Sequence, residues 1–133
     1  MYIQRKTKAN TKYEYGCDLR RLYPWDKVVD PLWGAAIASV RPGESTDPHR
    51  HDELETFIVI SGQGVMLVGS EKAELGQGDV VYIPRNETHS FQNISAIDEL
   101  VFLTIYWDSP ESLEKMKSII HSKETSYSIE EKI

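Results

Sequence analysis

Cysteine is nearly absent from this chain, since Cys17 is the only one among its 133 residues. A single cysteine cannot form a disulfide within the chain, which agrees with a reducing compartment. We expect it to be packed and unreactive, because only Arg20 and Arg21 lie near enough in sequence to activate it. Long apolar runs are absent as well: none approaches the ~20 residues of a membrane span, and the sequence after Met1 is polar and basic. We therefore expect a cytoplasmic protein that does not enter a membrane.

Basic residues are scarce outside the N-terminal segment. Residues 1–30 carry seven Lys and Arg against four Asp and Glu, whereas residues 31–133 carry eight against seventeen, for a net charge of −6. An acidic body repels phosphate, and the sequence shows no aromatic-basic array or recognition helix, so nucleic-acid binding is not expected. We interpret residues 1–30 as an arm that packs on the body or on a partner subunit.

The length of 133 residues, with 40% hydrophobic and 27% charged residues, indicates one globular domain. From Trp33 onward, short β-prone runs alternate with turns rich in Gly, Pro and Asn. The predicted strands are residues 33–41, 55–60, 64–69, 79–83, 88–93 and 99–107. Many short strands at regular spacing predict an all-β sandwich or barrel. We place this barrel at residues 31–108.

The strand that contains Glu55 has consequences for both faces of the barrel. If Glu55 faces inward, alternation turns Phe57 and Val59 inward and leaves Ile58 and Ile60 outside. Outward isoleucines need a cover, which could be the N-terminal segment, a second sheet or a second subunit. Of these we favour the second subunit, and we therefore expect a homodimer.

A helix is predicted after the last strand. Ser109 is a good N-cap, Pro110 suits the first helical position, and Glu111 places an acid in the first turn. Apolar residues then recur at helical spacing, so we expect a short helix over residues 110–121, followed by a polar, frayed tail that completes the segment 109–133. His121 is expected on the surface of this helix.

Histidine is also scarce, and three of the four histidines form one constellation with a glutamate. On a strand, His49 and His51 point to the same side, and Glu55 joins them if the extended conformation continues. Burying Glu55 between apolar neighbours costs several kcal/mol unless a cation or donors meet it. Imidazoles with one carboxylate suit divalent Zn, Fe, Mn, Ni or Co, and suit Ca or Mg poorly. The sequence therefore predicts one divalent transition metal bound by His49, His51, Glu55 and His89.

Glycines, a proline and an asparagine surround these four residues at fixed spacings. The positions are Gly43, His49, His51, Glu55 and Gly62, followed by Gly78, Pro84, His89 and Asn93. This pattern resembles the two motifs of the cupin superfamily, G-x5-H-x-H-x3-E-x6-G and G-x5-P-x-G-x2-H-x3-N. Asn86 departs from it by replacing a glycine, but asparagine tolerates positive φ, so the turn should survive. The resemblance implies a jelly-roll β-barrel in a superfamily of dioxygenases, isomerases, lyases and decarboxylases.

The segment at residues 13–25 is unusually dense in Tyr, Trp and Arg. Such residues are typical of a pocket rim or an interface, and equally of an arm packed over an open barrel end. The segment resembles the one that precedes the barrel in the cupin domains of hydrazine synthetases. That resemblance implies a redox-neutral rearrangement that forms an N–N bond.

We therefore expect a metal-dependent enzyme that acts on a small polar molecule, with the oxygenase, isomerase and lyase classes left open. The candidates for substrate binding are three arginines that could anchor a carboxylate and three residues on barrel strands: Arg20, Arg21, Arg41, Tyr82, Thr104 and Tyr106. No catalytic acid or base can be assigned from the sequence. The alternatives are the N–N bond-forming rearrangement and a noncatalytic ligand-binding or partner module with a structural metal.

Overall fold

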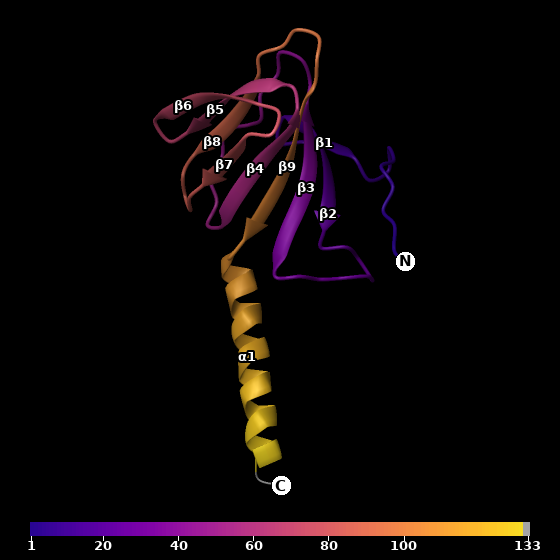
Figure 1. Ribbon diagram of the computed structural model, residues 1–133, viewed down its shortest axis with the longest axis vertical. Helices are drawn as coiled ribbons and strands as arrows, with labels where there is room; N and C mark the ends of the chain where they lie inside the picture. The colour runs from indigo at the N-terminus through magenta and orange to yellow at the C-terminus, as the bar shows by residue number, and fades with distance from the viewer. Residues whose placement is uncertain (132–133) are drawn as a thin grey trace.

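The computed structural model describes residues 1–131 and folds them into two antiparallel β-sheets and one helix (Figure 1). The larger sheet has the strand order β1-β2-β3-β9-β4-β7, and the smaller one has the order β6-β5-β8. The strands are β1 (Lys12–Glu14), β2 (Cys17–Tyr23), β3 (Trp33–Val40), β4 (Leu54–Ser61), β5 (Gln63–Val68), β6 (Glu71–Gly76), β7 (Val80–Ile83), β8 (His89–Asn93) and β9 (Leu100–Trp107). The predicted all-β jelly-roll fold is confirmed.

The core lies between the two sheets, and the alternation along β4 shows how it is built. Glu55, Phe57 and Val59 are buried, whereas Ile60 on the opposite face is 43% exposed. The Phe57 ring stacks on Phe102 of β9 with centroids 4.3 Å apart, and Phe102 lies 5.3 Å from Phe91 of β8. Aromatic contacts therefore join the sheets beneath the level of Glu55.

Two parts of the β-structure were not predicted. The arm at residues 1–30 contains β1 and β2, and β2 pairs with β3 along its length. Charged residues on β2 hide its alternation in the sequence. Cys17 at the start of β2 nevertheless lies in the core, and burial raises the pKa of its thiol to about 11. The other is β6 (Glu71–Gly76), a mostly exposed strand at the margin of the small sheet, where burial imposes no apolar pattern.

The helix α1 (Pro110–Glu131) begins where predicted but extends past residue 121. Its start is capped, because the amide of Ser112 donates to the hydroxyl of Ser109 at 3.1 Å. The predicted end is wrong because no glycine or proline follows Pro110 to stop the helix. Figure 1 shows α1 running away from the sheets. Within residues 1–131, no helix is long and apolar enough to cross a membrane.

Candidate metal centre

Main-chain pairing brings His49 and His89 together. They form an isolated antiparallel bridge in which the His89 amide donates to the His49 carbonyl at 2.9 Å and the His49 amide donates back at 3.2 Å. Opposed residues of an antiparallel pair place their side chains on one face of the sheet. The two ring centroids accordingly lie 4.5 Å apart. Backbone hydrogen bonds therefore fix the relative position of two histidines that are distant in sequence.

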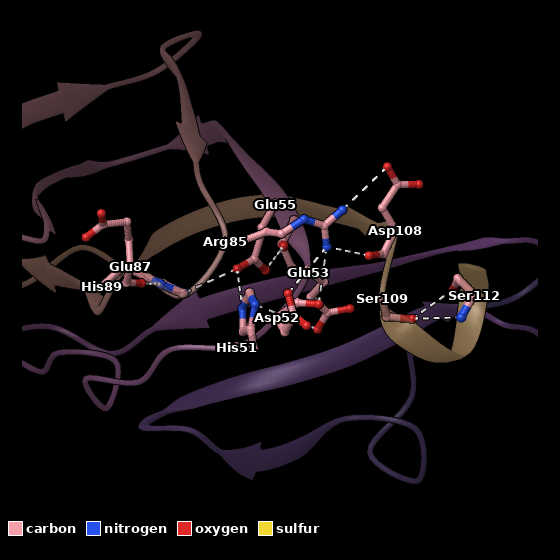
Figure 2. Close-up of polar contacts among 11 residues, drawn as sticks. His51, Asp52, Glu53, Glu55, Arg85, Glu87, His89, Asp108, Ser109 and Ser112 are labelled. Carbon is pink, nitrogen blue, oxygen red and sulfur yellow. Dashed lines mark hydrogen bonds and ion pairs between the residues drawn. The ribbon is translucent and has the colours of Figure 1, made fainter. Parts of the chain in front are cut away.

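His51 and Glu55 also lie beside these two histidines, although no continuous strand joins His51 to Glu55. The extended conformation does not continue from His51, because Asp52 and Glu53 form a bend and β4 starts at Leu54. The alternation of β4 nevertheless turns Glu55 toward the histidines, and Figure 2 shows its carboxylate between His51 and His89. The Glu55 Oε1 atom lies 3.0 Å from His51 Nε2 and 3.2 Å from His89 Nε2.

The three imidazoles are oriented in a way that suits metal binding. Each offers a nitrogen, and these nitrogens lie within 4.8 Å of one another. The Nδ1 atom of His49 lies 2.8 Å from the carbonyl of Asp47, and that of His89 lies 2.9 Å from the carbonyl of Glu87. A carbonyl accepts only from an N–H, so Nδ1 carries the proton and Nε2 keeps its lone pair. Both histidines therefore present Nε2 as a ligand atom.

The buried polar atoms around Glu55 test whether a cation fits. Burial opposes ionisation of Glu55, but its contacts with His51, His89 and Thr104 outweigh this effect and lower the pKa of the carboxyl to about 2. The Thr104 hydroxyl donates to Oε2 of this carboxylate. His89 Nε2 is buried without a hydrogen-bond partner, although Oε1 lies 3.2 Å away. A lone pair and a carboxylate oxygen at that distance repel each other, and a cation bound by both resolves the repulsion.

A set of contacts that sequence reasoning missed holds the loops of the site in place. Arg85 lies 3.6 Å from Asp52 and 3.7 Å from Asp108, so it links the bend after His51 to the end of β9 (Figure 2). The adjacent Asn86 has φ of 59°, and its main-chain N–H donates to the His51 carbonyl at 2.9 Å. The turn that asparagine was expected to tolerate is therefore present, and it supports the ligand loop.

A cavity of about 440 Å³ opens beside the histidines. Its walls include Arg21, Thr104 and Tyr106, three of the residues that the sequence suggested for substrate binding. Tyr15 and Glu53 also line it and were not suggested. Their signal in the sequence was weak, because Tyr15 lies in a turn of the arm and Glu53 in the bend before β4.

The other three candidates lie outside this cavity. Arg20 donates to the side chain of Gln4 at 2.9 Å, and Arg41 makes two hydrogen bonds of 3.0 Å to Asp18. Tyr82 is 54% exposed and lies near Trp107, with ring centroids 6.4 Å apart. The alternation of β2 and β7 turns Arg20 and Tyr82 away from the metal ligands, and Arg41 lies just beyond the end of β3.

Comparison with known proteins identifies the family. Residues 36–106, more than half of the chain, match the cupin domain, so the chain belongs to the cupin family. The structure is similar to that of the plu4264 protein from Photorhabdus luminescens, with 32% identity, a TM-score of 0.76 and coverage of 90% of this chain and 98% of that one.

Curated relatives match over shorter segments. A gentisate 1,2-dioxygenase from a Haloferax species is 39% identical over 46 residues, which are 35% of this chain and 13% of that protein. The oxalate-binding protein of Thermotoga maritima is 32% identical over 65 residues, or 48% and 53% of the two chains. The chain spans less than two thirds of the length of these relatives.

Proposed function

We propose that this protein is a metal-dependent cupin enzyme that acts on a small polar molecule. The observation that carries the proposal is the convergence of three imidazoles and one buried carboxylate at the wall of a cavity. His49, His51, His89 and Glu55 would hold one divalent Zn, Fe, Mn, Ni or Co ion. Four protein ligands leave coordination positions free for water or substrate, which favours catalysis over a structural ion. The bound ion would supply Lewis-acid or redox chemistry.

Two relatives support the class of ligand. One is named as a dioxygenase of gentisate and the other as a binder of oxalate, and both molecules are small organic acids. Their matches to this chain are short, so they support a small polar ligand and leave the reaction type open. The resemblance of residues 13–25 to hydrazine synthetase cupin domains favours a redox-neutral reaction.

Oxygen dependence tests the proposed reaction class. We expect the Zn(II)-loaded protein to convert an ester of an N-hydroxylated amino acid equally well with and without oxygen, because an N–N bond-forming rearrangement transfers no electrons to an oxidant. Chromatography of the products, with gentisate and oxalate as parallel substrates, provides the measurement. Product that forms only with iron and oxygen would overturn the redox-neutral assignment. Tight binding without turnover under any condition would identify a noncatalytic module.

Acid should release the metal. An imidazole binds metal in its neutral form, and the ordinary histidine pKa is about 6.5, so metal affinity should fall steeply below about pH 6. The hydrogen bond to Glu55 raises the pKa of His51 and strengthens this competition, whereas Glu55, with a pKa near 2, stays ionised. Metal retained after dialysis at a series of pH values measures the effect. Retention that is flat down to about pH 4 would exclude the histidines as ligands.

The homodimer that we propose would use the outer face of the large sheet. Ile37, Leu103, Ile58 and Val80 lie opposite one another on β3, β9, β4 and β7, which makes an apolar row across four strands. Val80 is 61% exposed at the end of this row. The N-terminal segment contacts the sheet at β2, where Gln4 lies, and leaves Val80 uncovered. A second copy would bury this face.

Charge placed on this face should separate the subunits. We expect wild type to sediment as a dimer and Val80→Lys to sediment as a monomer, because dimerisation would bury the ammonium group without a partner. Val80 is exposed, so the variant should fold. Ala73→Lys adds the same charge to an exposed position of β6 and should stay dimeric. A wild-type monomer at tens of micromolar would contradict the proposed interface.

A further inference from the structure

The hairpin β1–β2 is fixed against the metal centre. Tyr15 and Gly16 form its turn with φ of 57° and 77°, the positive values of a tight hairpin. The amide of Asp47 donates to the Tyr15 carbonyl at 2.9 Å. A Cβ atom at Gly16 would lie 2.5 Å from the Ser45 carbonyl oxygen, so the turn approaches the ligand loop closely. The Tyr15 ring lies 5.6 Å from that of His49.

Strand β2 supplies one wall of the cavity beside the histidines. Alternation directs Cys17, Leu19 and Arg21 into this cavity, whereas Arg20 is directed away and bonds to Gln4. The register of β2 shifts just after Arg21, and such irregularities commonly re-aim side chains near functional sites. This wall lies outside residues 36–106, the segment that matches the cupin domain. It is therefore specific to a part of the chain that the family match does not cover.

Arg21 keeps N–H donors that no other side chain in residues 1–131 uses. Its Nη1 donates to Glu14, and within the described part of the chain no second side chain binds its guanidinium. A guanidinium carries five N–H donors in a planar fork that matches a carboxylate. Tyr106 lines the same cavity, and its hydroxyl makes no hydrogen bond within residues 1–131. Together they form a polar end to the cavity.

The strand register places Arg21 two strands away from Thr104 on the same face of the large sheet. Arg21 pairs with Ala36, and Ala36 pairs with Thr104, whose hydroxyl donates to Glu55. Neighbouring strands lie about 4.8 Å apart, so Arg21 and Thr104 are separated by roughly 10 Å at the backbone. The alanine between them leaves space, and Leu19 and Phe102 add apolar walls.

The charge of the cavity selects the sign of its ligand. A bound divalent ion, Arg21 and Arg50 together outweigh the carboxylates of Glu53, Glu55 and Glu14, the last of which is paired with Arg21. An anionic ligand would therefore be attracted, and a cationic one repelled. We propose that Arg21 binds the acidic group of a small organic anion with an apolar body, so that the hairpin β1–β2 determines the substrate class. This inference deepens the proposed function, because it assigns a substrate to the same metal cavity.

Benzoate and its uncharged counterpart benzamide are suitable probes. Titration calorimetry should show that wild type binds benzoate at least about tenfold more tightly than benzamide, because a charge-assisted bidentate contact favours the anion. Arg21→Gln should lower this ratio several-fold in metal-loaded protein, where the ion still attracts the anion, and to about one in metal-free protein. Arg20→Gln makes the same change on the opposite face of β2 and should preserve the ratio. Glu14→Gln frees a donor of Arg21 and should strengthen benzoate binding several-fold.

The same titrations with chelator-treated protein separate this inference from the proposed function. A preference for benzoate that depends on Arg21 in both metal-free and metal-loaded protein supports the inference. Failure of wild type to bind benzoate, or a preference for benzoate that Arg21→Gln leaves undiminished in a folded variant, overturns the inference without affecting the proposed metal centre. Failure to take up metal overturns the proposed function, while the metal-free titration still tests Arg21.

Discussion

Replacing His89 with alanine should lower metal affinity by about 100-fold or more, because the substitution removes a ligand that both the backbone and a carbonyl hold in place. His49→Ala removes the opposite member of the same bridge and should have a similar effect. Elemental analysis after gel filtration, followed by competition with a chromophoric chelator, measures the loss. The two variants together test whether the histidine cluster is the metal site.

A control separates loss of a ligand from loss of folding. His121→Ala changes an exposed histidine on α1, away from the cluster, and should leave metal affinity unchanged. His89 is 2% exposed, so its truncation also leaves a void, and each variant needs an unfolding measurement. Metal should raise the unfolding midpoint of wild type and leave that of His89→Ala unchanged. Comparable loss of metal from all three variants would show that the assignment is wrong.

The sequence predicted the strands of the barrel because burial imposes a pattern on them. Each predicted strand from residue 33 onward occurs in the structure within about one residue at either end. The inward facing of Phe57 and Val59 followed from the period of two. By contrast, β2 and β6 are rich in charged residues, and their pairing depends on neighbours that the local sequence does not reveal.

The candidate site was predictable in composition but not in geometry. Spacing brought out His49, His51, Glu55 and His89, and the structure brings these residues together. The cross-strand bridge and the bend at residues 52–53 are properties of the folded chain, so the sequence could not supply them. The sequence also did not determine which face of its strand each arginine side chain occupies. Arg20 and Arg21 are adjacent in sequence, yet only Arg21 lines the cavity.

Asn93 shows how a motif residue can stabilise the fold without contacting a ligand. Its amide nitrogen donates to the carbonyls of Val40 at 3.0 Å and Asp98 at 2.7 Å, and its oxygen accepts from the Ser95 amide at 2.9 Å. The side chain is 1% exposed. These bonds join the end of β3 to the loop before β9, so Asn93 ties a turn. Asn93 therefore stabilises the fold.

Asn93→Asp should lower the free energy of unfolding by about 3–5 kcal/mol at pH 7, measured by urea denaturation. The introduced carboxylate cannot donate, so it leaves two buried carbonyls without partners and places negative charge against them. Burial raises the pKa of this carboxyl in the folded state, so the folded state binds protons more readily than the unfolded state. The deficit relative to wild type should therefore shrink as pH falls from 7 toward 4, because a protonated carboxyl regains one donor.

Gln92→Glu provides the matched control for this prediction. It makes the same amide-to-acid change at the adjacent, exposed position of β8 and should cost less than about 0.5 kcal/mol. Equal losses in the two variants would mean that added negative charge, and not the broken hydrogen bonds, is responsible. A deficit in Asn93→Asp that is independent of pH would also contradict the argument, because it would exclude a buried ionised carboxyl as the cause.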